Sequence, residues 1–241
     1  MVPVTSKRVT NQTPGTSGAP RAPEDPSVPG RTVESVATPP GNARITWHTA
    51  ARPRLVLALG HGAGGGIEAR DLRALAEALP PHGVTVALVE QPWRVAGKKL
   101  APAPKTLDTA WRALWPALER PGRPVVAGGR SAGARVACRT ARELGAAAVL
   151  ALSFPLHPPG RPEKSRADEL TAAGLPTLVV QGGNDPFGKP AEFPAGAFGL
   201  VEVPYADHGF AVPKKAAISQ VDGVEIITSG VRTWLEAHGE C

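Results

Sequence analysis

The chain has 241 residues and a formal net charge of +6 at pH 7, with 42% hydrophobic and 20% charged residues. This composition is typical of a globular protein with one sizeable core, and the length requires no second domain. The positive charge is spread along the chain, mostly as arginine, and forms no basic block with interleaved aromatic residues, which argues against a nucleic-acid partner. No apolar run approaches the roughly eighteen residues of a membrane span, so we expect no membrane partner.

The cysteine content indicates the compartment. Only Cys138 and Cys241 are present, and they lie far apart in the sequence. This excludes a disulfide framework and a cysteine-based metal site, so we expect no metal. The first residues lack the apolar core of a secretory signal, and both observations favour a cytoplasmic location.

The first thirty residues differ in composition from the rest of the chain. They contain no Leu, Ile or aromatic residue, while Pro, Ser, Thr and Gly recur. Such a segment cannot bury enough apolar surface to offset its ordering entropy. We therefore predict a disordered tail over residues 1–30 and one domain over residues 31–241.

The domain alternates between apolar runs and segments of helical periodicity. Residues 32–37 and 44–49 alternate apolar with polar around Pro39-Pro40-Gly41, which predicts an antiparallel hairpin at a sheet edge. Buried strands are predicted at 54–59, 84–89, 125–127, 147–152, 175–180 and 200–203, and helices at 71–79, 106–119, from 131 to about 145, and 221–237. This order predicts an α/β domain with a mostly parallel central sheet and helices on both faces. Only a short, proline-rich insert at 155–170 is available as a cap.

The sequence Gly129-Arg130-Ser131-Ala132-Gly133 follows a β-branched run and precedes a segment of good helix propensity. In a Gly-x-Ser-x-Gly elbow between strand and helix, the serine is held in strained backbone angles with its hydroxyl exposed above the sheet. The two glycines are needed because a Cβ at either place would collide with neighbouring backbone. The alternative is an ordinary strand-to-helix turn in a chain rich in glycine and alanine.

A serine nucleophile needs a base, and the base needs an acceptor that fixes its tautomer. His208 follows the last predicted strand and is the best-placed histidine, while Asp185 lies just past another buried strand. Chemistry in such sheets gathers at the carboxyl ends of the strands. Asp185 has an alternative role as a turn former in a Gly/Pro-rich loop. Asp207 is a poor rival for it, because side chains of adjacent residues diverge.

A tetrahedral intermediate also needs donors for its oxyanion. We assign one donor to the backbone N–H of Ala132, just after the nucleophile, and the other to Ala63 in the glycine-rich loop 60–66, with Gly64 as the reserve. That loop could instead bind a phosphate, but it has neither the Gly-x-Gly-x-x-Gly nor the Gly-Lys-Ser/Thr form.

Four further residues are candidates for substrate binding. His61 lies in the same glycine-rich loop, and Arg94 and Lys98 follow another strand end. Arg94 and Lys98, together with Arg130, could recognise an acidic substrate. The alternative for Arg94 and Lys98 is a solvated surface loop. The short insert predicts an open site for small or medium esters.

The four motifs at 61–64, 129–133, 183–188 and 207–210, in this order, resemble the α/β-hydrolase family over about residues 32–238. Within it they are most similar to a branch of small dienelactone-hydrolase-like proteins, a eukaryotic NSL chromatin-complex subunit and its testis-expressed relative. The resemblance implies Ser131, Asp185 and His208 as nucleophile, acid and base, and Ala63 and Ala132 as oxyanion donors. True dienelactone hydrolases use a cysteine nucleophile where this chain has Ser131, so their substrate is not implied.

Three functions remain open from the sequence. The first is a cofactor-free serine hydrolase of carboxylic esters or thioesters, acting on a small-molecule substrate through an acyl-enzyme. The second is a catalytically silent hydrolase domain that serves as a protein-interaction scaffold. The third keeps the triad for perhydrolysis or amide cleavage, which the motifs cannot separate from ester hydrolysis. The sequence does not determine the oligomeric state.

Overall fold

A computed structural model describes residue 1, residues 30–196 and residues 198–238 of the chain. Apart from Met1 and Gly30, the predicted disordered tail lies outside the described residues. Cys241 also lies outside them.

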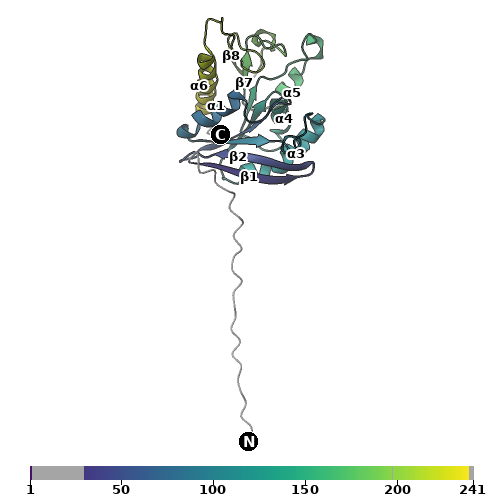
Figure 1. Cartoon of the computed structure of the whole chain (residues 1–241), viewed down its shortest axis with the longest axis vertical. Coiled ribbons are helices and arrows are strands. Elements are labelled where there is room, and N and C mark those ends of the chain that lie inside the picture. Colours follow the sequence, from purple (N-terminus) through teal and green to yellow (C-terminus); the bar gives the residue numbers. More distant parts are fainter. Residues whose placement is uncertain (2–29, 197, 239–241) are drawn as a thin grey trace.

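The core of the domain is an eight-stranded sheet with the order β1-β2-β4-β3-β5-β6-β7-β8. The strands are β1 (Arg31–Thr38), β2 (Gly41–His48), β3 (Leu55–Gly60), β4 (Val84–Glu90), β5 (Val125–Arg130), β6 (Ala148–Leu152), β7 (Thr177–Gly182) and β8 (Gly199–Val203). β1 and β2 pair antiparallel and form one edge, β2 joins β4 antiparallel, and all other neighbours run parallel. In Figure 1 this edge hairpin lies at the opposite end of the sheet from β7 and β8.

Helices cover both faces of the sheet, as the sequence predicts. They are α1 (Arg70–Ala78), α2 (Pro92–Val95), α3 (Pro104–Glu119), α4 (Ala132–Thr140), α5 (Ala167–Thr171) and α6 (Gln220–His238). α1 and α6 contact one another on one face, whereas α3, α4 and α5 form a contiguous layer on the other (Figure 1). The central parallel strands are buried on both faces, which explains their nearly unbroken apolar sequences.

The predicted strands and α-helices agree in type and order with the structure except at three places, and the short 3₁₀ helices Pro80–His82, Pro162–Lys164 and Pro190–Glu192 were not predicted. The helix predicted to continue to about residue 145 ends at Thr140, because residues 141–145 form separate turns that close at Gly145 with φ +67°. α5 lies inside the insert that we predicted at 155–170, and α2 was not predicted. Both are too short for a periodic pattern to reveal them.

β3, β5 and α4 approach one another unusually closely. A Cβ at Gly133 would lie 2.4 Å from the carbonyl oxygen of Gly60, and one at Gly129 would lie 2.6 Å from the same atom. β3 lies between β4 and β5 in the sheet, so the strand order reverses here: the chain passes from β3 to β4 on one side and then crosses over to β5 on the other side. Ligands of open α/β sheets bind at such a reversal of strand order, and Ser131 lies there.

Candidate active site

Ser131 occupies the single-residue turn between β5 and α4. Its backbone angles are φ 53° and ψ −109°, a conformation that a non-glycine residue adopts only at an energetic cost. The Ser131 N–H donates to the carbonyl of Leu152 on the neighbouring strand at 2.9 Å, which fixes the turn to the sheet. This is the strand–turn–helix arrangement that the Gly-x-Ser-x-Gly spacing predicts.

The structure brings Ser131, His208 and Asp185 together from three separate loops. His208 Nε2 lies 3.0 Å from Ser131 Oγ, and His208 Nδ1 lies 2.8 Å from Asp185 Oδ2. A carboxylate can only accept from Nδ1–H, so the neutral ring presents the lone pair of Nε2 to the serine hydroxyl. The Asp185 side chain is fully buried, while that of His208 is 21% exposed, so solvent reaches the histidine but not the acid.

Two residues that sequence reasoning missed hold the acid and the histidine in place. The Gln181 side chain donates to Asp185 Oδ2 at 2.8 Å, and the Phe187 N–H donates to Oδ1 at 2.8 Å. The Phe187 ring also packs against the His208 ring with 4.3 Å between centroids. The signal for Gln181 was available, because an amide in an otherwise apolar buried strand needs a polar partner.

Ala63 and Ala132 line the same small hollow beside Ser131. Ala132 is the first residue of α4, where backbone N–H groups lack intrahelical partners. Neither the Ala63 nor the Ala132 N–H donates to a backbone carbonyl within the described residues. Gly62, the residue before Ala63, packs against the nucleophile, because a Cβ at Gly62 would lie 3.3 Å from the Ser131 Cβ. Both free donors therefore lie close to the serine.

His61 was predicted as a substrate contact, but both of its ring nitrogens bind within the chain. The Gln91 N–H donates to Nε2 at 3.1 Å, so Nδ1 carries the proton and donates to the Gly62 carbonyl at 2.8 Å. Burial lowers the pKa of His61 and favours this neutral form. The C=O of Gly62 and the N–H of Ala63 belong to one planar trans peptide and point in opposite directions. His61 thus orients the Ala63 N–H and has no nitrogen left for a substrate.

Arg130 was also predicted to bind substrate, and its guanidinium is instead engaged by the protein. Arg130 Nε lies 3.2 Å from Oδ2 of Asp71 on α1, whose side chain is fully buried. Arg130 also donates to the backbone carbonyl of His208. Burial raises the pKa of Asp71, and the nearby Arg130 charge opposes part of that rise. Arg130 therefore contacts both α1 and the loop that carries His208, and so links them. Sequence reasoning missed Asp71, which reads as an ordinary acidic residue in the first turn of a helix.

The two remaining predicted contacts differ in their surroundings. Arg94 pairs with Glu68 at 3.1 Å, so its charge is already partnered. Lys98 is exposed and lines a hollow next to Trp93. The hypothesis of an acidic substrate now depends on Lys98, and it stays a prediction.

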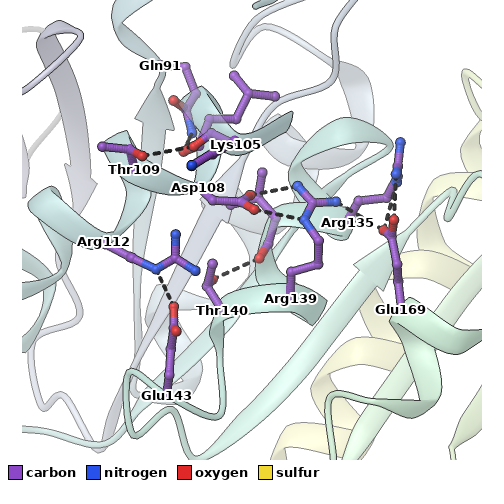
Figure 2. Close-up of polar contacts among 12 residues, drawn as sticks. Gln91, Lys105, Asp108, Thr109, Arg112, Arg135, Arg139, Thr140, Glu143 and Glu169 are labelled. Atoms are coloured by element: carbon purple, nitrogen blue, oxygen red, sulfur yellow. Dashed lines mark hydrogen bonds and ion pairs between the residues drawn. The ribbon is translucent and has the colours of Figure 1, made fainter. Parts of the chain in front are cut away.

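Ion pairs hold the insert between β6 and β7 against α4. Glu169 on α5 accepts from Arg135 at 2.8 Å and from Arg139 at 3.0 Å, both on α4. Arg139 also pairs bidentately with Asp108 on α3, at 2.9 and 2.6 Å. Figure 2 shows Arg139 facing Asp108 and Arg135 facing Glu169. These paired contacts hold α5 against α4, so the short insert is part of the helical layer.

Cys138 lies on α4 but is not a second nucleophile. Its side chain is almost completely buried, and burial raises the pKa of the thiol to about 12. Since the thiolate is the reactive form, Cys138 is inert near neutral pH.

The described residues also lack two kinds of feature. No group of three or more His, Cys, Asp or Glu side chains among them is placed to bind a metal ion. In the same part of the chain, no helix combines the length and apolar character needed to cross a bilayer.

Solved structures with the same fold include serine hydrolases and esterases. XC6422 from Xanthomonas campestris, described as an α/β serine hydrolase without a lid, matches with a TM-score of 0.65 and 19% identity over 86% of this chain and 96% of its own. A dienelactone hydrolase from Anabaena variabilis matches with a TM-score of 0.65 and 19% identity over 86% and 97%. Est1E from Butyrivibrio proteoclasticus matches with a TM-score of 0.63 and 14% identity over 85% and 99%. At these identities the likeness shows the fold.

Sequence comparison identifies the family. No curated protein sequence matches the chain. The family model for the alpha/beta hydrolase domain matches residues 52–236, which is most of the chain and includes every residue of the site described above. The chain therefore belongs to the alpha/beta hydrolase domain family.

Proposed function

We propose that this protein is a serine hydrolase that cleaves carboxylic esters or thioesters of small or medium substrates through an acyl-enzyme. The observation that carries the proposal is the continuous hydrogen-bonded chain from Asp185 through His208 to Ser131, with distances of 2.8 and 3.0 Å. The nucleophile, the base and the group that orients the base lie within the reach that nucleophilic catalysis requires.

In the first half-reaction Ser131 Oγ attacks the carbonyl carbon while its proton passes to His208 Nε2. The negative charge that develops on the carbonyl oxygen is stabilised by the N–H groups of Ala63 and Ala132. Asp185 accepts from Nδ1–H and stabilises the imidazolium that forms. When the tetrahedral intermediate collapses, His208 gives the proton to the leaving alcohol or thiol, and the acyl group stays on Ser131.

In the second half-reaction a water molecule replaces the leaving group. His208 Nε2 takes a proton from this water as its oxygen attacks the acyl-enzyme, and the same two N–H groups stabilise the second oxyanion. Collapse returns the proton to Ser131 Oγ and releases the carboxylic acid. No cofactor takes part in either step.

We also propose how open the site is, where the protein is located and to which branch of the family it belongs. The insert, held against α4, and the partly exposed His208 support an open site for small-molecule substrates. We also propose a cytoplasmic location, a domain boundary at residue 31, and membership of the dienelactone-hydrolase-like branch that includes the NSL-complex subunit and its testis-expressed relative.

A fluorophosphonate probe tests the proposal, because it phosphonylates a serine that is activated by a working base and oxyanion donors. We expect the wild-type protein to gain the mass of the phosphonyl group at Ser131, and the His208→Ala variant to remain unlabelled over the same time. Wild-type protein that is folded by circular dichroism yet unlabelled would contradict the proposal and favour the scaffold function.

A further inference from the structure

His157 is not part of the triad, but its backbone contacts the loop that carries the acid. It lies in the segment after β6 and is only 6% exposed. The His157 N–H donates to the carbonyl of Phe187 at 3.0 Å. The two loops pack tightly beside this bond, because a Cβ at Gly188 would lie 2.7 Å from the Leu156 Cβ. His157 therefore fixes the position of the Phe187 backbone.

Phe187 in turn contacts two members of the triad. Its N–H donates to Asp185 Oδ1 at 2.8 Å, and its ring centroid lies 4.3 Å from that of His208. A shift of Phe187 would move both a hydrogen-bond donor of the acid and the ring against which the base packs. Displacement of catalytic groups by about 1 Å can cost about a hundredfold in rate. The contacts that hold Phe187 in place therefore bear on catalysis.

Both ring nitrogens of His157 face groups that only accept hydrogen bonds. Nδ1 lies 2.9 Å from the Pro158 carbonyl oxygen, and Nε2 lies 3.0 Å from Glu192 Oε2. The other carboxylate oxygen of Glu192 accepts from the Lys189 N–H at 2.8 Å, which lowers the pKa of Glu192 and keeps it ionised. A neutral imidazole has one N–H and can make only one of the two bonds of His157. Both bonds together require the imidazolium.

The groups around the His157 ring favour this charged form on balance. The pKa of His157 lies above its usual value of 6.5, because the Pro158 carbonyl and the Glu192 carboxylate both favour the protonated ring. Burial and the charge of Arg166, whose guanidinium donates to the Pro155 carbonyl at 2.8 Å, oppose part of this rise. As the pH rises through the pKa of His157, the ring loses one proton and with it one of its two bonds.

We propose that His157 and Glu192 are positioning residues, whose ion pair holds Phe187 in contact with the triad. Loss of the pair at high pH displaces Phe187 from His208 and slows attack by Ser131 Oγ. His157 acts through Phe187 and is not itself a catalytic residue. This proposal rests on the hydrolase function proposed above and adds a dependence on pH to it.

Glu192→Gln tests the proposal, because it can keep the hydrogen bonds of the pair without the charge. The introduced amide oxygen can accept from the Lys189 N–H, and the amide NH2 group can donate to Nε2 of a neutral His157. Glu143→Gln is the matched control. Glu143 is also in an ion pair, with Arg112 (Figure 2), and its side chain is 47% exposed compared with 40% for Glu192.

The rate of Ser131 labelling by the fluorophosphonate probe is measured by intact mass at pH 7 and pH 9. We expect the ratio of the pH 9 rate to the pH 7 rate to be about fivefold higher in Glu192→Gln than in the wild type, because only the wild-type pair loses a bond as the pH rises. Any pH dependence that the two proteins share cancels in this comparison. Glu143→Gln should keep the wild-type ratio.

Proton–carbon NMR of the histidine rings gives a readout that is independent of activity. The resonance missing from His157→Gln should titrate above the usual histidine pKa in the wild type and at a lower pH in Glu192→Gln. Equal rate ratios in Glu192→Gln and the wild type, or an unchanged midpoint of His157, would overturn the proposal, while labelling of Ser131 upholds the hydrolase function. Folded wild-type protein that stays unlabelled would overturn both.

Discussion

Replacing Ser131 with alanine is expected to lower the turnover of an activated ester by a factor on the order of 10⁴, because the variant has no atom to attack the carbonyl. His208→Ala should lose about as much, since the serine hydroxyl is a poor nucleophile without a base 3.0 Å away. Steady-state rates measured with 4-nitrophenyl acetate check both losses.

A double variant provides the control for this prediction. Residues that act as one unit are non-additive, so the Ser131→Ala/His208→Ala protein should be no slower than either single variant. Asp185→Asn should also lose rate while keeping the fold, because an amide can present N–H to Nδ1 and stabilise the wrong tautomer. A Ser131→Ala protein that keeps more than about a tenth of the wild-type rate would contradict the assignment of the nucleophile.

Replacing Arg130 with methionine is expected to lower the free energy of unfolding by about 3–5 kcal/mol, because the fully buried Asp71 loses the charge 3.2 Å away. The loss should exceed that of a typical surface substitution, since the Arg130 side chain is only 14% exposed and also binds the His208 carbonyl. Urea denaturation at pH 7 measures the change.

The Asp71→Asn/Arg130→Met variant is the matched control for Arg130→Met. It removes the buried charge together with its partner, so it should be more stable than Arg130→Met alone.

The pH dependence of stability gives a second test. Burial raises the pKa of Asp71 in the folded state above that of the unfolded state, so in Arg130→Met this group favours folding at low pH, and that benefit is lost as the pH rises from about 4. If Arg130→Met were as stable as the wild type, or if the double variant were no more stable than Arg130→Met, the structural role of the pair would be contradicted.

The fold was predictable because its determinants are local in the sequence. The parallel strands appear as short apolar runs, for example 84–89, since residues on both faces are buried. The edge hairpin appears as alternation around Pro39-Pro40-Gly41, and β1 and β2 lie there at the edge of the sheet. Helix ends were less predictable. Residues 141–145 have the composition of a helix, but turns that end at Gly145 replace it.

The proximity of Ser131, Asp185 and His208 could be anticipated because each follows a strand of one parallel sheet. The carboxyl ends of such strands meet at the same edge, so residue type and position together suffice. The same reasoning selected His61 and Arg130 as substrate contacts, but it could not show which groups of the chain itself they bind. The sequence does not show that Nε2 of His61 accepts from Gln91, or that α1 brings Asp71 to Arg130. These contacts depend on how separate elements pack.

Detection of the acyl-enzyme itself tests the proposed hydrolase function most directly. Wild-type protein is mixed with excess 4-nitrophenyl 3-phenylpropanoate, quenched in acid within the first turnover and measured by intact-mass spectrometry. We expect a mass gain equal to one phenylpropanoyl group, mapped by peptide analysis to Ser131 and absent from Ser131→Ala. Hydrolysis of the ester without any acyl adduct on Ser131, or with the adduct on another residue, would contradict the assignment of Ser131 as the nucleophile.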